Sequence, residues 1–164
     1  MSLRVVTVDT DELRAAMTAI RMTVFVTEQG VDPAVEMDEL DDDPATLHVV
    51  ALSSDGRALG TARLLAPHHE DEPAHIGRVA VLSDARGLGV GAVLMSSLES
   101  EALARFGVVV DGHRSVSVEL SAQEQAIGFY ERAGYVARPK RYLSENIWHR
   151  DAVKIVRSTD TPQQ

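Results

Sequence analysis

Cysteine is absent from this sequence of 164 residues, which excludes disulfide bonds and metal sites built from thiolates. Long hydrophobic runs are absent as well, because no apolar stretch approaches the roughly 20 residues that span a membrane. The first residues, MSLRVV, lead quickly to Asp9 and Asp11 without the apolar core of a signal peptide. We therefore expect a cytoplasmic protein that does not bind membranes.

Basic residues are few relative to acidic ones. The sequence has 16 Lys and Arg against 25 Asp and Glu, which gives a formal net charge of −9. Binding to nucleic acid depends on clustered Lys and Arg, so this balance argues against a nucleic-acid partner. The excess of acidic residues favours a cationic partner, although a need for solubility alone would also explain the net charge. The run from Glu36 to Asp43 is almost wholly acidic, and we expect an exposed loop there because such a run cannot be buried unpaired.

What the sequence does contain is a series of short segments with strand and helix patterns. β-branched and alternating segments predict strands at 4–8, 47–52, 58–65, 75–82, 115–121, 135–137 and 147–156. Apolar residues at helical spacing predict one or two helices between 11 and 26, a long helix over 90–106 and a short helix over 123–133. Residues 107–112 fit either a short strand or an irregular extension. The length suits one domain over 1–157, followed by a disordered polar tail at 158–164.

Three glycines at alternate positions precede the long helix, in the segment ARGLGVGAVLM from Ala85 to Met95. A strand, a glycine turn and a helix in this order place free backbone N–H groups and the positive end of the helix dipole at one point. Glycine lets an anion reach those amides and permits a positive φ. The segment therefore predicts a phosphate site, although a tight turn without a ligand also fits the glycines alone. No Lys-Ser or Lys-Thr follows, which excludes a nucleoside triphosphatase.

Two phosphate ligands fit the glycine segment. One is a dinucleotide, because Gly87, Gly89 and Ala92 satisfy G-x-G-x-x-A and Asp111 follows roughly 20 residues later. Four residues separate the strand from these glycines, however, and too little chain follows Asp111 for a doubly wound sheet. The other interpretation rests on a pattern R-x-x-G-x-G that begins at Arg86.

The pattern R-x-x-G-x-G at 86–91 resembles that of the GNAT family of N-acetyltransferases. A second segment, AIGFYERAGY from Ala126 to Tyr135, is similar to the family signature N-x-x-A-x-x-F-Y-E-x-x-G-F. Gln123 stands where the family often has Asn, and Tyr135 replaces the final Phe. The resemblance covers most of the chain and implies a single-domain α/β (α+β) fold, with a mixed, mostly antiparallel sheet of six to seven strands flanked by helices.

The resemblance also implies a reaction. The chain would bind acetyl-CoA as a co-substrate, need no metal, and transfer the acetyl group to a primary amine by direct attack in a ternary complex. Loop amides would bind the pyrophosphate, and amides near Val79 to Val81 would stabilise the carbonyl oxygen. The implied cofactor-binding residues are Val79, Ala80, Val81, Arg86, Gly87, Leu88, Gly89, Val90, Gly91, Ala92, Gln123 and Tyr130.

Acetyl transfer needs a proton for the departing thiolate and a base for the amine. Tyr130 occupies the family's tyrosine position, and a phenol with a pKa near 10 can protonate a thiolate, so Tyr130 is the predicted acid. The same ring on an apolar helix face also fits core packing. Glu119, His149 and Glu28 are the candidate bases, and proton release to water is the alternative.

Residues near the N-terminus are similar to the small bacterial ElaA-like branch of the family. They are Arg21, Phe25, Glu28 and Gln29, together with Asp38 and Asp41. The similarity implies an acceptor site between the first helices and the last hairpin, with the first four of these residues binding substrate. The acceptor is expected to be a small-molecule or peptide amine, and the acidic run favours a cationic one. Family members often pair, so a homodimer is a further expectation.

Two other hypotheses remain beside the enzyme. His68 and His69 adjoin the acidic residues 70–72, but an adjacent histidine pair on a polar loop rarely converges on a metal, so no metal site is predicted. An acyl-CoA-binding module without catalysis, acting as a sensor or partner protein, would need the same glycine segment. Turnover that depends on Tyr130 would distinguish the enzyme from such a module.

Overall fold

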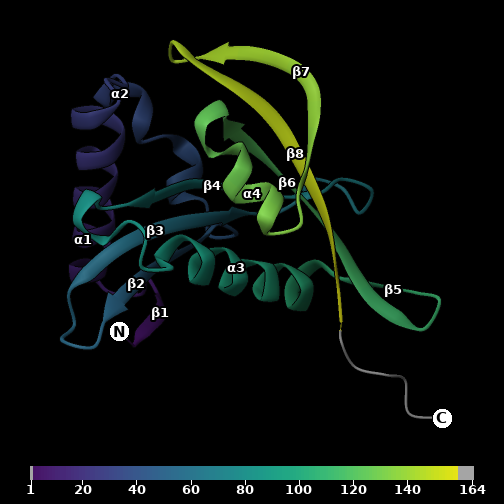
Figure 1. The fold of residues 1–164 in the computed structure, drawn as a ribbon. Helices are drawn as coiled ribbons and strands as arrows, with labels where there is room; N and C mark the ends of the chain where they lie inside the picture. Colours follow the sequence, from purple (N-terminus) through teal and green to yellow (C-terminus); the bar gives the residue numbers. More distant parts are fainter. Residues whose placement is uncertain (1, 159–164) are drawn as a thin grey trace. The chain divides into compact units, whose positions relative to one another are not determined.

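The computed structural model describes residues 2–158, so the predicted disordered tail at 158–164 lies outside the described residues apart from Ser158. The chain forms two compact units, drawn in Figure 1. Of the described residues, 2–65 and Ile76–Leu98 form the first unit, and Ala66–His75 and 99–158 form the second. No helix in the described part of the chain is long and apolar enough to cross a membrane.

The first unit is built on antiparallel strands. Strand β1 (Leu3–Thr7) pairs with β2 (Leu47–Ser53), which pairs with β3 (Ala58–Leu65). The two strands predicted at 47–52 and 58–65 thus form a hairpin, and Gly56 at its turn has a φ of +84°. Helix α1 (Asp11–Arg21) begins after Thr10, whose hydroxyl accepts a hydrogen bond from the Leu13 amide at 3.1 Å. Helix α1 packs against β2 and β3 (Figure 1).

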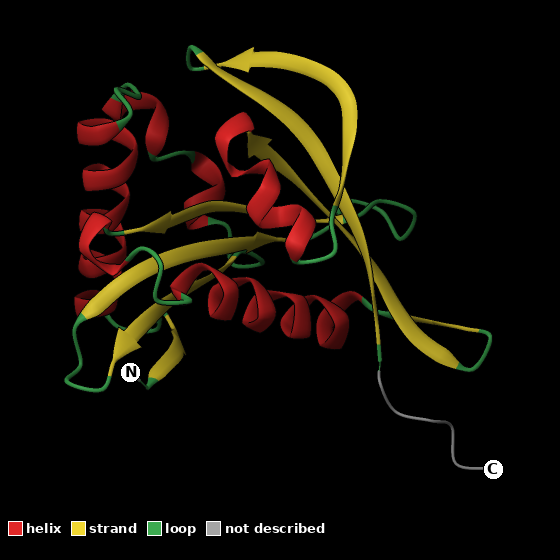
Figure 2. Cartoon of the chain, in the orientation of Figure 1, coloured by secondary structure: helices red, strands yellow, loops and turns green. Residues whose placement is uncertain are grey.

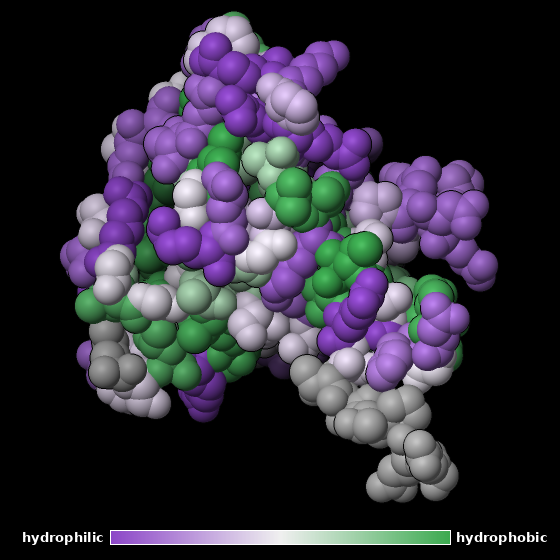
Figure 3. Space-filling model, turned by 45° about the vertical axis from the view of Figure 1, so that its right-hand side comes forward, coloured by the Kyte–Doolittle hydropathy of each residue, from purple (hydrophilic) through white to green (hydrophobic). Residues whose placement is uncertain are grey.

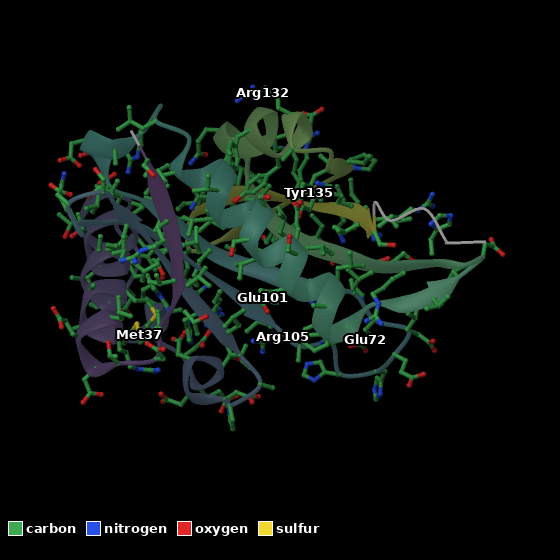
Figure 4. The ribbon with its side chains drawn as sticks, turned by 90° about the horizontal axis from the view of Figure 1, so that it is seen from below. Met37, Glu72, Glu101, Arg105, Arg132 and Tyr135 are labelled. Carbon is green, nitrogen blue, oxygen red and sulfur yellow. The ribbon has the colours of Figure 1, made fainter. Side chains whose placement is uncertain are left out.

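The chain after α1 departs from the predicted helix. Residues Met22–Glu28 form a π-helix, which apolar spacing cannot reveal because it changes the number of residues per turn. Two short turns follow where an exposed acidic loop was expected, namely α2 (Pro33–Glu36) and a 3₁₀ helix (Glu39–Asp42). Met37 lies between them, is labelled in Figure 4, and packs against the core residues Met17, Val50 and Leu52. The packing of Met37 therefore anchors the acidic run to the core.

Strand β4 (Ala74–Val81) leads through a 3₁₀ turn (Ser83–Ala85) to helix α3 (Val90–Phe106), as predicted. In the first unit, β3 and the end of β4 lie against the start of α3 at Gly60. A Cβ on Gly60 would lie 2.9 Å from both the Ala80 carbonyl oxygen and Val90 Cγ1. Glycine at this position permits the close approach. The predicted apolar stripe of α3 is buried at Val90, Leu94, Leu98 and Ala102.

In the second unit, the long strand β6 (His113–Gln123) pairs antiparallel with β8 (Ile147–Arg157), and β8 pairs antiparallel with β7 (Val136–Ser144). The first residues of β4 pair in parallel with β6, and β5 (Val108–Val110) pairs antiparallel with its start. Figure 2 shows β7 and β8 as a long twisted hairpin. Strand β7 is longer than the predicted 135–137. The prediction stopped early because Pro139 and its basic neighbours, which lie at a register shift, interrupt the strand pattern.

The short helix before β7 is also shorter than predicted. Gln123 still belongs to β6, a 3₁₀ turn covers Glu124–Ala126, and helix α4 covers only Ile127–Arg132. Gly134 has a φ of +98°, in the left-handed region typical of a residue that ends a helix. The α/β class with a mixed, mostly antiparallel sheet is confirmed. Residues 2–158 contain eight strands, against the six to seven expected, because the ambiguous segment at 107–112 includes the short strand β5.

Large apolar side chains remain exposed on the strands of the second unit. They are Val108, Val109, Val110, Val136, Leu143, Trp148 and Ile155. On the face drawn in Figure 3, apolar residues form separate green patches among hydrophilic ones. Within its hairpin, Trp148 is covered in part by the guanidinium of Arg141, whose Cζ lies 4.1 Å from the ring centre.

Candidate functional site

The glycine loop before α3 has the geometry that a phosphate site needs. Gly87 has a φ of +82° and Gly89 a φ of +83°, a region that favours glycine. A Cβ on either residue would meet no heavy atom within 4 Å in the described structure. The glycines are therefore required by the backbone conformation, and the space beside the loop is open to a ligand.

Backbone donors at the start of α3 face this loop. The first hydrogen bond of the helix runs from the Val93 amide to the Gly89 carbonyl oxygen at 3.1 Å. The amides of Val90, Gly91 and Ala92 precede that bond, and the first N–H groups of a helix have no partner within it. With the positive end of the helix dipole, they form a site suited to a diphosphate.

Arg86 joins the glycine loop to a residue predicted for the acceptor site. Its Nη2 donates to Glu28 Oε2 at 2.6 Å, and its Nε donates to the Val81 carbonyl oxygen at 3.1 Å. Both side chains are partly exposed. The structure thus brings Glu28, at the end of the π-helix, to the predicted cofactor loop, and part of the positive charge of Arg86 is balanced there.

Strand β4 changes direction before the predicted oxyanion residues. Arg78 has a φ of +52°, in the left-handed region, and Val79 to Val81 follow it directly. The Leu82 amide donates to the Leu59 carbonyl oxygen at 2.9 Å, which ties the end of this segment to β3. A single left-handed residue turns the peptides that follow it away from the regular strand pattern.

Tyr130 lies on α4 in an apolar environment within the second unit. Its ring meets Phe129 edge-on at 5.0 Å and Tyr135 edge-on at 6.0 Å between ring centres. Burial raises the pKa of Tyr130 to about 12, so the phenol stays protonated at neutral pH. The hydroxyl of Tyr135, labelled in Figure 4, donates to Glu99 at 2.8 Å, and Lys154 binds the other oxygen of Glu99 at 2.9 Å.

The two base candidates of the second unit lie on adjacent strands. Glu119 on β6 accepts a hydrogen bond from Arg138 at 3.3 Å and lies 3.8 Å from His75 Nε2. His149 on β8 stands opposite Gln123 in the sheet register, and its Nδ1 lies 2.7 Å from the Ile147 carbonyl oxygen.

Sequence patterns missed a polar group beside these candidates. The hydroxyl of Tyr142 donates to Asp151 at 2.7 Å and contacts the hydroxyl of Ser121, and its ring stacks on His149 at 5.7 Å. Burial raises the pKa of Tyr142. The hydrogen bond with Ser121 opposes this shift, and the hydrogen bond to Asp151 adds to it, so the net shift is upward. Tyr142 lies on the part of β7 that was not predicted, so the sequence carried no signal for this group.

The prediction that Arg21 binds substrate is wrong, because its side chain is 1% exposed and bound internally. Its Nε donates to Glu36 Oε1 at 2.9 Å, and its Nη1 donates to Asp41 Oδ1 at 2.7 Å. Phe25 is buried as well, at 8% exposure. Of the four residues predicted to bind the acceptor, Glu28 and Gln29 are the accessible ones.

The acidic run is only in part the exposed loop that was expected. Glu36 and Asp41 are each 3% exposed, and they form a buried cluster with three arginines of the first unit. Its members are Arg21, Glu36, Asp38, Asp41, Arg63 and Arg78. The run could be buried because each internal acid has an arginine partner. Glu36, Asp38 and Asp41 therefore supply no free charge for a cationic acceptor, whereas Glu39, Asp42 and Asp43 of the run are exposed.

Arginine hydrogen bonds lower the pKa values of two aspartates in this cluster. A hydrogen bond from Arg63 lowers the pKa of Asp38. Burial raises the pKa of Asp41, but hydrogen bonds from Arg21 and the Asp38 amide outweigh it and hold that pKa well below its usual range. Burial lowers the pKa of His48, which lies 3.1 Å from the Asp41 carbonyl oxygen. Asp38 and Asp41 are therefore charged at neutral pH.

Comparison with known proteins identifies the family. Residues 14–135 match the model of the Acetyltransferase (GNAT) family. An acyl-CoA N-acyltransferase from Pseudomonas aeruginosa is 34% identical, with a TM-score of 0.77 over 93% of this chain and 99% of that one. Escherichia coli ElaA is 25% identical, with a TM-score of 0.76 over 94% and 99%. No curated protein matched the chain.

The chain belongs to the GNAT acetyltransferase family, and its similarity to ElaA confirms the predicted branch. An aminoglycoside 6′-N-acetyltransferase complexed with coenzyme A shares the fold at 17% identity and a TM-score of 0.71 over 94% of this chain and 97% of that one. The dinucleotide interpretation is wrong. Asp111 lies in the turn between antiparallel strands β5 and β6, with a φ of +51°, and not at the end of a parallel strand.

The histidine pair at His68 and His69 gives no metal centre in the structure. Within residues 2–158, no group of three or more His, Asp or Glu side chains is arranged to hold a metal ion. These two residues instead line, with Arg105 and the start of β5, an open pocket of about 520 Å³ in the second unit.

Proposed function

We propose that the protein is an N-acetyltransferase that moves an acetyl group from acetyl-CoA to a primary amine. The observation that carries the proposal is the glycine loop before α3, in a chain of the acetyltransferase family. Its two left-handed glycines stand beside open space, and its amides precede the first bond of a helix of 17 residues. A structure of the same fold, an aminoglycoside 6′-N-acetyltransferase, was solved with coenzyme A.

Each proposed step has a residue of this chain. The amides from Gly87 to Ala92, with Arg86, hold the diphosphate of acetyl-CoA, and Gln123 holds its pantetheine arm. The amine nitrogen attacks the thioester carbonyl carbon, and the amides of Val79 to Val81 stabilise the negative oxygen that forms. The C–S bond then breaks, the thiolate of coenzyme A takes a proton, and the amine proton leaves with a base or with water.

Tyr130 is the proposed proton donor to the thiolate. Burial keeps the phenol of Tyr130 protonated, so it has a proton to give. Burial also raises the pKa of the coenzyme A thiol, which makes the departing thiolate a stronger base for that proton. Glu119 and His149 remain the proposed bases, and Glu28, which pairs with Arg86, is proposed to contact the acceptor. The acceptor is a small-molecule or peptide amine, with a cationic one favoured by the net charge of −9, and Glu28 and Gln29 help to bind it.

A catalytically inactive acyl-CoA sensor is the second candidate, because the glycine loop alone would serve it equally. A thiol-release assay with acetyl-CoA, run with and without each member of an amine library, separates the two. The account predicts release of free coenzyme A that depends on at least one amine and saturates with it. Binding of coenzyme A without amine-dependent release across small amines, peptides and lysine-bearing proteins would favour the sensor.

A further inference from the structure

Arg78 has a backbone conformation that its residue type does not favour. Its φ of +52° lies in the left-handed region, which glycine adopts freely and which asparagine and aspartate tolerate better than arginine. It stands within β4, and Val79 follows it at once. Strained residues of this kind persist only where their surroundings fix them, and they gather at functional sites.

The side chain of Arg78 is held at several points by the acidic run. Its Nε lies 3.3 Å from both the carbonyl oxygen and Oε1 of Glu36, and its Nη2 lies 3.2 Å from the same carbonyl oxygen. The Nη2 group also lies 3.3 Å from Asp38 Oδ2. The guanidinium is thus tied to two successive turns of the first unit, α2 and the 3₁₀ helix.

The partners of Arg78 are themselves fixed in place. Arg21 binds the carboxylate of Glu36 at 2.9 Å and its carbonyl oxygen at 2.7 Å. Arg63 forms a two-pronged contact with Asp38, at 2.7 and 3.0 Å. Met37 between the two acids packs into the core. A bidentate contact between a guanidinium and a carboxylate prevents the carboxylate from rotating, so Asp38 can hold Arg78 in a defined position.

We propose that Arg78 is a positioning residue, through which the buried ion-pair cluster holds β4 in its left-handed bend and so aims the amides of Val79 to Val81 at the thioester carbonyl. The aim toward the thioester rests on the proposed function. The bend and its anchoring do not. This proposal gives Glu36 and Asp38 of the acidic run a role in the reaction.

The proposal predicts an unusual order of activity between two variants. Arg78→Gly and Arg78→Ala both remove the guanidinium, but glycine adopts a φ of +52° without strain and alanine does not. We expect kcat to fall about 10- to 100-fold in Arg78→Ala, because the bend relaxes and the amides are displaced. Arg78→Gly should keep several times more activity than Arg78→Ala. Both should bind coenzyme A as the wild type does, because the loop at 86–92 is unchanged.

A purely structural role predicts that kcat follows stability, because glycine also relieves backbone strain at a φ of +52°. Urea unfolding measures the stability of both variants. The proposal expects the loss of kcat in Arg78→Ala at temperatures where the variant remains fully folded. An Arg78→Ala variant with unchanged kcat, or an Arg78→Gly variant no more active than it, would overturn the proposal.

A second measurement keeps the bend testable without activity. The three-bond coupling between the amide and α protons at residue 78 reports φ directly in labelled protein. We expect a left-handed value in the wild type and in Arg78→Gly, and an extended one in Arg78→Ala and in Asp38→Asn. If the couplings agree with this expectation while no amine supports thiol release, the proposed function fails and the anchoring stands. A left-handed coupling in Arg78→Ala overturns the anchoring itself.

Discussion

Replacing Tyr130 by phenylalanine is expected to lower kcat about 100-fold while the affinity for coenzyme A stays unchanged. General acid catalysis by a positioned side chain contributes about 10² to 10⁴ in rate, and the substitution removes only the proton donor. The edge-on contacts with Phe129 and Tyr135 are preserved, because both are made by the ring. Steady-state thiol release gives kcat, and calorimetry gives the dissociation constant.

Tyr135→Phe is the matched control. It removes a hydroxyl from the neighbouring ring, which donates to Glu99, and it installs the residue that the family signature carries at this position. The control is expected to lose some stability and to keep kcat. Equal losses in the two variants would mean that the hydroxyl of Tyr130 has no special part in the reaction, and an unchanged kcat in Tyr130→Phe would remove it from the mechanism.

Asp41→Asn is expected to lower the free energy of unfolding by about 3 to 5 kcal/mol, because breaking a buried ion pair leaves uncompensated charge. Asp41 accepts hydrogen bonds from Arg21 at 2.7 Å, from Arg63 at 2.9 Å and from the Asp38 amide at 2.9 Å. An amide in its place cannot compensate two buried guanidinium groups. The midpoint of urea unfolding measures the loss.

The adjacent Asp42→Asn variant makes the same chemical change at an exposed position. Asp42 pairs with Arg14 at 2.7 Å, but its side chain is 82% exposed, so a change of at most about 1 kcal/mol is expected. Similar losses in the two variants would show that the cluster around Asp41 contributes no more than a surface pair.

The glycine loop was predictable because its signal is local. A strand, a turn with glycines and a helix with an apolar stripe occupy consecutive residues, and the left-handed values at Gly87 and Gly89 follow from that order. The α/β class was predictable for the same reason, since the hairpin at 47–65 and the long strands carry their own patterns.

The acidic run was mispredicted because its partners are distant in the sequence. The composition of these eight mostly acidic residues predicts that they avoid the interior. Arg21, Arg63 and Arg78, which come from three other elements, pair with Glu36 and Asp38 instead. No local pattern reports such pairing. The same limit applies to Arg21, whose position suggested substrate contact and whose burial is decided by Glu36 and Asp41.

The π-helix and the far half of β7 were missed for a different reason. A π-helix from Met22 to Glu28 shifts the spacing of its residues away from the helical pattern. In β7, Pro139 lies within the register shift between Ala137 and Arg141, and the polar residues around it read as a turn. Tyr142, beyond that shift, could not be assigned to the sheet from sequence.

Calorimetric titration of coenzyme A into the wild type, Gly89→Leu and Gly56→Leu tests the central claim most directly. The two glycines have nearly equal φ values, +83° and +84°, and both would place a Cβ in open space, but Gly56 lies in a hairpin turn. Both variants carry the same backbone strain. The account predicts that the wild type and Gly56→Leu bind coenzyme A alike, and that Gly89→Leu binds at least about tenfold more weakly, because its side chain keeps the diphosphate from the loop amides. Equal affinity in all three proteins, or no binding to the wild type, would contradict it.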